Sequence, residues 1–217
     1  MITYKILLLG DSMVGKSTFI IRFCEGKFED ETFISTIGLD TKTKYILHKN
    51  HKIQLKIWDT AGEERFHSIT KNTFKGANGI LLMYDISNYD TFKHIKNWIS
   101  DIKNNANVEF DKIAIIILGN KSDLPDDLRK VDKDDIEKFE NENEGLKIME
   151  VSVKNNYNVN ESMMALIDRM LELGVWKRKK STNEDDEEEG QKINNNKNKK
   201  KKGNCCDDGG KKNKNLE

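Results

Sequence analysis

Short apolar runs alternate along this chain with longer stretches in which apolar residues recur every three or four positions. The short runs are rich in Ile, Leu and Val and predict strands, whereas the longer periodicity predicts helices. Such an alternation is typical of an α/β fold. The predicted strands are residues 4–9, 45–47, 52–58, 79–84, 113–118 and 147–151.

The apolar pattern within each run indicates where that strand lies in the sheet. Apolar and polar residues alternate in 52–58, so this strand should bury one face and form an antiparallel hairpin with 45–47. The runs at 79–84 and 113–118 are apolar on both faces. We therefore expect them in the middle of a parallel sheet.

Helices are expected after the first, fourth and fifth strands and at the end of the domain. Two apolar stripes at helical spacing support this expectation. The last helix should begin with Asn158 or Asn160 as its N-cap, and its methionines should fill the core. The first stripe consists of Phe92, Ile95, Ile99 and Ile102, and the second of Met163, Met164, Ile167, Met170 and Leu171.

Composition favours one globular domain followed by a polar tail. The chain has 217 residues, of which 36% are hydrophobic and 34% charged, and its formal net charge is zero. From Lys177 onward there are thirteen basic and nine acidic residues, which leaves 24 basic and 28 acidic residues before that point. Residues 1–176 are therefore predicted to form a mildly acidic domain, which argues against nucleic-acid binding. Residues 177–217 are predicted to be disordered, because they hold too few apolar groups to fold.

The three cysteines predict no disulfide framework and favour a reducing, cytoplasmic environment. Cys24 is expected to have no nearby basic partner that would make it reactive. The longest apolar run, 113–118, is too short to span a membrane. Surface or packing roles, rather than metal binding, are expected for His48, His51, His67 and His94.

A glycine-rich segment, "GDSMVGKS", directly follows the first predicted strand and precedes a helical pattern. It matches the phosphate-loop pattern G-x-x-x-x-G-K-[ST] in the strand, turn and helix context that this pattern requires. Main-chain N–H groups would surround phosphate oxygens, the lysine would add a positive charge, and the serine hydroxyl would bind Mg²⁺. The predicted phosphate contacts are Gly10, Asp11, Ser12, Met13, Val14, Gly15, Lys16 and Ser17.

A second polar segment, "NKSD", follows the strand at 113–118 and is predicted to select the base. The carboxylate of Asp123 can accept hydrogen bonds from guanine N1–H and from the guanine amino group, whereas adenine presents an acceptor at N1. Asn120 and Lys121 belong to the same segment. The sequence therefore predicts a guanine nucleotide.

Three further segments complete the predicted site. Asp59 ends the strand at 52–58 and suits an outer-shell position at Mg²⁺, while the N–H of Gly62 suits the terminal phosphate. Thr36, in "STIG", offers a hydroxyl to the same ion when a γ-phosphate is present. The segment "EVSVK", after the last strand, brings three residues under the base: Ser152, Val153 and Lys154.

Taken together and in this order, these segments resemble the Rab branch of the Ras superfamily of small GTPases over residues 4 to about 174. The resemblance is carried by "STIGLD", "KIWDTAGEERF", "FKGANGILLMYDIS", "GNKSDL" and "EVSVK". It implies a P-loop NTPase small G-domain, with a six-stranded, mostly parallel sheet that has one antiparallel edge strand and helices on both faces. It also implies GTP/GDP and Mg²⁺ binding, slow GTP hydrolysis, and two nucleotide-dependent switch loops at about 29–39 and 61–74.

The resemblance assigns roles within the site. It adds Thr18 and Phe28 to the nucleotide contacts, with Phe28 against the base. It places Ser17, Thr36 and Asp59 around Mg²⁺. The residues expected to take part in hydrolysis are Glu63, Lys16, Thr36 and Gly62.

This sequence departs from the Rab pattern at three positions. Rab proteins usually carry Gln where Glu63 stands; an ionised Glu cannot donate to the phosphate, whereas a protonated Glu would keep a donor. Hydrolysis assisted by this residue is therefore expected to be altered, most simply reduced, unless the side chain lies in solvent. Met13 replaces a usual glycine and would be strained if its φ is positive. Thr41 replaces a usual Phe, so the aromatic effector patch with Trp58 and Phe74 is incomplete.

The resemblance also implies partners and a location. A guanine nucleotide exchange factor, a GTPase-activating protein, a GDP-dissociation inhibitor and Rab effectors are expected, with a monomeric protein that acts in vesicle trafficking. Cys205 and Cys206 correspond to the paired cysteines at which Rab proteins are prenylated. The segment "DDGGKKNKNLE" follows them, however, and matches no C-a-a-X pattern. If the pair is prenylated, a cytoplasmic protein would cycle to the cytosolic face of an endomembrane.

Three other functions remain as alternatives. The first is a module of the same fold that holds GTP and scarcely hydrolyses it. The second is an ATP-using P-loop enzyme, which Asp123 disfavours. The third is a nucleic-acid-binding role of the tail, which only its lysine runs support.

Overall fold

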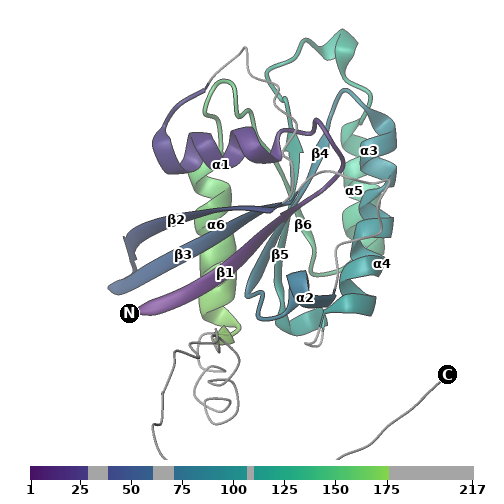
Figure 1. Ribbon diagram of the computed structural model, residues 1–217. Helices are drawn as coiled ribbons and strands as arrows, with labels where there is room; N and C mark the ends of the chain where they lie inside the picture. The colour runs from purple at the N-terminus through teal and green to yellow at the C-terminus, as the bar shows by residue number, and fades with distance from the viewer. Residues whose placement is uncertain (29–38, 61–70, 107–109, 176–217) are drawn as a thin grey trace, which may run out of the picture. The chain divides into compact units, whose positions relative to one another are not determined.

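The computed structural model describes residues 1–28, 39–60, 71–106 and 110–175 (Figure 1). The strands are β1 (Ile2–Leu9), β2 (Leu39–His48), β3 (His51–Thr60), β4 (Gly79–Asp85), β5 (Ala114–Asn120) and β6 (Lys147–Glu150). The α-helices are α1 (Lys16–Glu25), α2 (Lys71–Phe74), α3 (Tyr89–Lys93), α4 (Ile95–Asn105), α5 (Lys133–Glu142) and α6 (Val159–Glu172), with 3₁₀ turns η1 (Phe110–Lys112) and η2 (Asp126–Leu128). No helix in these ranges is long and apolar enough to cross a membrane.

In this part of the chain, the six strands form one sheet in the order β2-β3-β1-β4-β5-β6. β2 pairs antiparallel with β3, while every other neighbouring pair is parallel. This confirms the predicted mostly parallel sheet with one antiparallel edge strand. β4 and β5 are buried along their full lengths and lie side by side, as their apolar runs predict.

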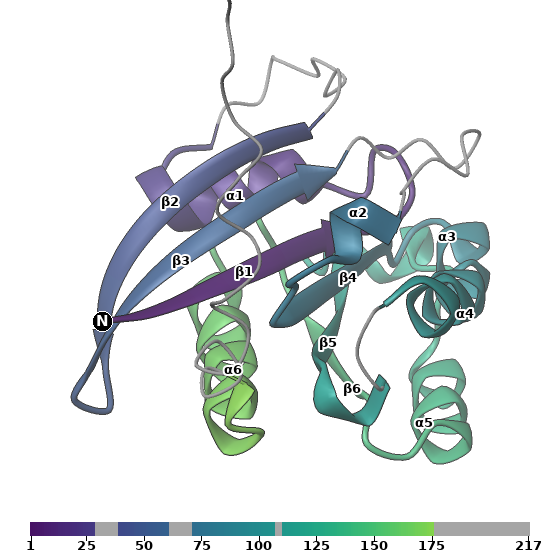
Figure 2. The ribbon, with the colours of Figure 1, turned by 60° about the horizontal axis from the view of Figure 1, so that its bottom comes forward.

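Helices cover both faces of the sheet, as predicted (Figure 2). On one face, α1 and α6 pack against β1, β3, β4 and β5 around one hydrophobic core. On the other face, α3, α4 and α5 pack against β4, β5 and β6 around a second core. Met163 and Met170 of α6 are fully buried, so the prediction that these methionines fill the core is confirmed.

The edge strand β2 is longer than the predicted 45–47, because polar residues rather than apolar ones secure its first half. The Lys42 ammonium forms an ion pair with the Glu25 carboxylate at 2.6 Å. The Lys44 ammonium donates to the Phe23 carbonyl and lies 4.1 Å from the centroid of the Phe23 ring. A lysine can pack through its methylene groups and its charge, but it counts as a polar residue in the pattern from which strands are predicted.

The helical segments differ from the prediction at three points. The stripe that begins at Phe92 spans two helices, α3 and α4, which meet at His94. The four-residue helix α2 is not predicted by any apolar stripe. Asn158 does take the N-cap position of α6, but with a φ of 56° and no capping hydrogen bond from its side chain. Instead, its Nδ2 donates to the Glu150 carbonyl, so the predicted N-cap position is confirmed while the side chain does not cap the helix.

Candidate functional site

The loop of residues 10–17 joins β1 to the N-terminus of α1, and its backbone requires two glycines. Gly10 has a φ of 135° and Gly15 a φ of 100°. A Cβ on Gly10 would lie 2.2 Å from the Met83 carbonyl oxygen, and a Cβ on Gly15 would lie 2.4 Å from Asn120 Nδ2. No larger residue fits at either position. The loop therefore approaches its neighbours closely just before the helix begins, and the N-terminus of a helix favours an anion.

Met13 lies in the same loop with a φ of 62°. Its position therefore has the positive φ that glycine adopts without strain. The side chain is 72% exposed, so little packing offsets that strain. Ser12 precedes it and is exposed as well.

The ammonium group of Lys16 is held by the loop that precedes it. Lys16 is 5% exposed, and its Nζ donates to the carbonyl oxygens of Gly10 at 2.8 Å and Asp11 at 2.6 Å. These two bonds fix the position of the charge at the helix N-terminus. A lysine so placed complements a phosphate group in front of the loop.

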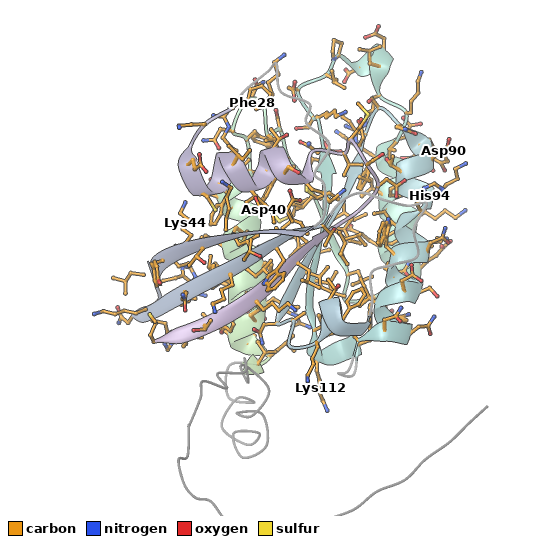
Figure 3. All side chains as sticks on the ribbon, viewed as in Figure 1. Phe28, Asp40, Lys44, Asp90, His94 and Lys112 are labelled. Carbon is orange, nitrogen blue, oxygen red and sulfur yellow. The ribbon has the colours of Figure 1, made fainter. Side chains whose placement is uncertain are left out.

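A small cavity of about 100 Å³ lies beside Ser17 at the start of α1. Its polar lining includes the Ser17 hydroxyl and the carboxylates of Asp59 and Asp40, together with Lys42. Hydroxyl and carboxylate oxygens are the ligands that Mg²⁺ prefers, so this donor set fits the ion. Asp40 lies at the start of β2 (Figure 3) and was not among the predicted site residues. Nothing in its spacing from the other segments indicates it, because the antiparallel pairing of β2 with β3 is what places Asp40 opposite Asp59.

The side chain of Asn120, at the end of β5, connects the phosphate loop to the predicted base-binding segments. Its Nδ2 donates to the Val14 carbonyl at 2.8 Å, and its Oδ1 accepts from the Val153 N–H at 3.2 Å. Asn120 is 3% exposed, so both bonds are shielded from water. One amide thus bridges two loops that lie far apart in the sequence.

Asp123 and Ser152 also lie together, because the Ser152 hydroxyl donates to Asp123 Oδ1. The same hydroxyl oxygen accepts from the Asn155 N–H at 3.0 Å. Lys121 has a φ of 70°, and its Nζ forms an ion pair with Asp85 Oδ2 at 2.5 Å. The structure therefore brings the "NKSD" and "EVSVK" segments into one cluster, as the sequence predicts from their places at strand ends.

Arg22 of α1 holds the backbone of residues 153 and 154 by hydrogen bonds, and it was not among the predicted site residues. Its Nε donates to the Val153 carbonyl at 3.0 Å, and its Nη2 donates to the Lys154 carbonyl at 2.7 Å. Its guanidinium lies 5.2 Å from the centroid of the Phe28 ring. Phe28 is labelled in Figure 3. Arg22 therefore connects Phe28 to the backbone of residues 153 and 154, a link that the sequence alone does not indicate.

Comparison with known proteins identifies the family. The family model described as "Ras family" matches residues 5–172. The chain is 46% identical over 163 residues to Ras-related protein Rab-8B of Homo sapiens, and this match covers 75% of this chain and 76% of Rab-8B. It is 42% identical over 172 residues to Ras-related protein Rab-13 of Bos taurus, covering 79% and 82% of the two chains. The chain belongs to the Rab branch of the Ras family. This Rab is a small GTPase that binds GTP and GDP, hydrolyses GTP and acts in vesicle trafficking.

Several of the predicted functional residues of this Rab lie outside the described residues. They include the predicted switch residues and the predicted lipidation pair. Their roles therefore stay predictions. These residues are Thr36, Gly62, Glu63, Cys205 and Cys206.

Cys24 of this Rab has basic neighbours, contrary to the expectation from the sequence. Lys44 and Lys42 act electrostatically on its thiol and favour the thiolate. Burial nevertheless outweighs them and raises the pKa of Cys24. The thiol is therefore a poor nucleophile, and the expectation that Cys24 is not reactive agrees with its surroundings.

Proposed function

We propose that this Rab binds Mg²⁺-GTP with the phosphates on residues 10–17 and the base between Phe28 and residues 120–123 and 152–154. The observation that carries the proposal is the pair of buried hydrogen bonds through which Asn120 joins the phosphate loop to the 152–154 loop. A nucleotide suits a site that spans both loops, with its phosphate groups at the helix N-terminus and its base at residues 152–154. Ser17, Thr36 and Asp59 would hold Mg²⁺, with Thr18 beside them at the start of α1.

Asp123 is proposed to select guanine. The test is displacement of a fluorescent GDP from the purified protein with Mg²⁺ present, by unlabelled GTP or unlabelled ATP. GTP is expected to displace the probe at a concentration about 10⁴-fold lower than ATP, as for a site whose buried polar group would face an unmatched base. Comparable displacement by the two nucleotides would contradict the assignment of the base.

Glu63 is proposed to slow the assisted hydrolysis of GTP, because an ionised carboxylate accepts hydrogen bonds and cannot donate one to the transferring phosphate. Single-turnover release of phosphate would be compared between the parent protein, Glu63→Gln and the control Glu64→Gln, which removes the same charge one residue further on. Glu63→Gln is expected to be faster by about 10²-fold, the contribution of one aligned donor, and Glu64→Gln is expected to match the parent. Equal rates for all three proteins would contradict a role of Glu63.

If a protonated Glu63 keeps the donor, the parent rate should approach that of Glu63→Gln as the pH falls. Measurement of both rates between pH 5 and 8 therefore separates the two forms of the carboxyl. A parent rate that stays low at every pH supports the ionised form.

The partners are proposed to include an exchange factor, a GTPase-activating protein, a GDP-dissociation inhibitor and effectors that tolerate an incomplete aromatic patch. Thr41 of β2 pairs in register with Trp58 of β3, so a threonine occupies the position beside the indole. Effectors that require an aromatic ring there are expected to bind Thr41→Phe at least about ten-fold more tightly than the parent, as titration would measure. Equal affinity would contradict the proposal.

Membrane attachment is proposed to occur through prenylation of Cys205 and Cys206. The intact mass of the protein isolated from its native cells would report two added isoprenoid chains. A mass without such chains would contradict the proposal and would leave the polar tail with only weak electrostatic binding to anionic lipids.

A further inference from the structure

The carboxylate of Asp11, in the phosphate loop, is held by two side chains of the α3–α4 segment. Trp98 Nε1 donates to Asp11 Oδ1 at 2.9 Å, and His94 Nδ1 lies 2.6 Å from Asp11 Oδ2. Asp11 and Trp98 are 7% and 8% exposed, whereas the His94 side chain is 44% exposed. A carboxylate that is so buried requires such partners.

The two donors belong to one face of the helical segment. His94 and Trp98 are four residues apart in the sequence. The backbone N–H of Trp98 donates to the backbone carbonyl of His94 at 3.0 Å, so the turn between them is helical. The sequence suggested a surface or packing role for His94. The bond to Asp11 shows that His94 instead holds a carboxylate of the phosphate loop. Together the two side chains occupy both oxygens of the Asp11 carboxylate.

Asp11 in turn positions Lys16. Its carbonyl oxygen accepts the shortest described hydrogen bond from the Lys16 ammonium, at 2.6 Å. A shift of Asp11 thus moves the point at which the lysine charge is held. The connection runs from the helix, through one carboxylate and one carbonyl, to the charge in front of the phosphate loop.

We propose that His94 and Trp98 are positioning residues for the nucleotide phosphates, acting through Asp11 on Lys16. The proposal rests on the proposed nucleotide site and adds a determinant of affinity outside the loops that touch the ligand. Among the described charged groups near His94, Asp90 of α3 is already paired with Lys93 at 2.5 Å, and Figure 3 shows Asp90 and His94 in the same region. Asp11 is the carboxylate to which the His94 ring is bonded.

The experiment compares the affinities for GDP and for GMP, because GMP lacks the phosphates that a phosphate-loop lysine reaches. Trp98→Phe keeps an aromatic ring and deletes the N–H donor together with part of the indole, and the GMP affinity reports the general effect of that lost packing. This variant is expected to weaken GDP binding about ten-fold, equivalent to about 1.4 kcal/mol, while GMP binding changes less than about two-fold. Equal weakening of GDP and GMP, or unchanged GDP binding, would overturn the proposal.

His94 supplies a second and independent variant. His94→Leu removes the donor, whereas His94→Asn keeps an amide close to the place of Nδ1. The leucine variant is expected to resemble Trp98→Phe, and the asparagine variant is expected to recover at least half of the lost affinity in free-energy terms. If both variants behave alike, the hydrogen bond to Asp11 is not the cause.

Two controls separate positioning from general damage. Tyr89→Phe deletes another aromatic donor of the same segment, whose hydroxyl donates to Asp135 of α5 at 3.2 Å rather than to Asp11. It is expected to leave both affinities unchanged, and a GDP-selective loss would overturn the proposal. In an Asp11→Ala background, Trp98→Phe is expected to have no further effect, whereas an undiminished effect would contradict action through Asp11. If the parent protein itself failed to prefer GDP to GMP, the proposed nucleotide site would be wrong, which is a distinct outcome.

Discussion

The backbone strain at Met13 leads to a prediction about stability. Met13 has a φ of 62° and is 72% exposed, so its replacement changes the backbone preference with little loss of packing. We compare Met13→Gly with Met13→Ala, since both variants lack the long side chain and differ only in the Cβ. Met13→Gly is expected to be the more stable of the two.

The magnitude follows from two opposing effects at this position. A left-handed conformation costs a residue with a Cβ roughly 1–2 kcal/mol, which glycine avoids. Glycine also loses about 0.4–1 kcal/mol through the greater entropy of the unfolded chain. The net advantage of Met13→Gly over Met13→Ala is therefore about 0.8 kcal/mol, within a range from about 0 to 1.6. For a domain of this size that difference raises Tm by about 2–3 °C.

Urea unfolding in excess GDP and Mg²⁺ measures the difference, provided that nucleotide binding is treated separately. Each variant's Kd for GDP is determined on its own, and the stabilisation of RT ln(1 + [GDP]/Kd) is subtracted from the free energy of unfolding. Equal m-values would show that both variants unfold from comparable states. If Met13→Ala proved as stable as Met13→Gly after this subtraction, the inference of strain would be refuted.

Three further predictions concern buried or partly buried polar groups. Asn120→Ala leaves the buried Val14 carbonyl and the buried Val153 N–H without their partner. It should therefore weaken GDP binding roughly 30-fold or more in a fluorescence titration. An unchanged Kd would show that the Asn120 bridge is dispensable. Arg129→Ala breaks the two bonds to the Glu150 carboxylate and should lower the free energy of unfolding by about 1.5–3 kcal/mol in urea, with part of this restored when Glu150→Gln is added. Burial raises the pKa of Tyr4 to about 12 from 10.0, so its contribution to stability is complete below pH 10 and is lost as the pH rises to 12; Tyr4→Phe should lose less stability over that interval, and parallel pH profiles would contradict this.

The strands buried on both faces could be predicted from the sequence because their environment is uniform. Every position of β4 and β5 is buried, so each residue contributes to the apolar run. The edge strand β2 could be predicted only in part. Its inner contacts include the Lys44 ammonium on the Phe23 ring, and such a contact looks like an exposed polar position in the sequence.

The candidate site shows the same division between local and distant information. The phosphate loop is contiguous, so its glycines and Lys16 can be recognised from spacing alone. Arg22 and Asp40 could not be recognised, because their contacts depend on how α1 and β2 fold against distant loops. A side chain that bonds to a backbone carbonyl places no requirement on the identity of the residue that carries it. The sequence therefore holds no complementary residue to search for.

The Asn120 bridge has a consequence for how this Rab gives up its nucleotide. Since one buried amide secures both the phosphate loop and the 152–154 loop, neither end of the pocket can relax while the other keeps its geometry. Displacement of either loop then also disturbs the hydrogen bond to the other, so an exchange factor that moves one loop weakens the contacts of both loops with the nucleotide.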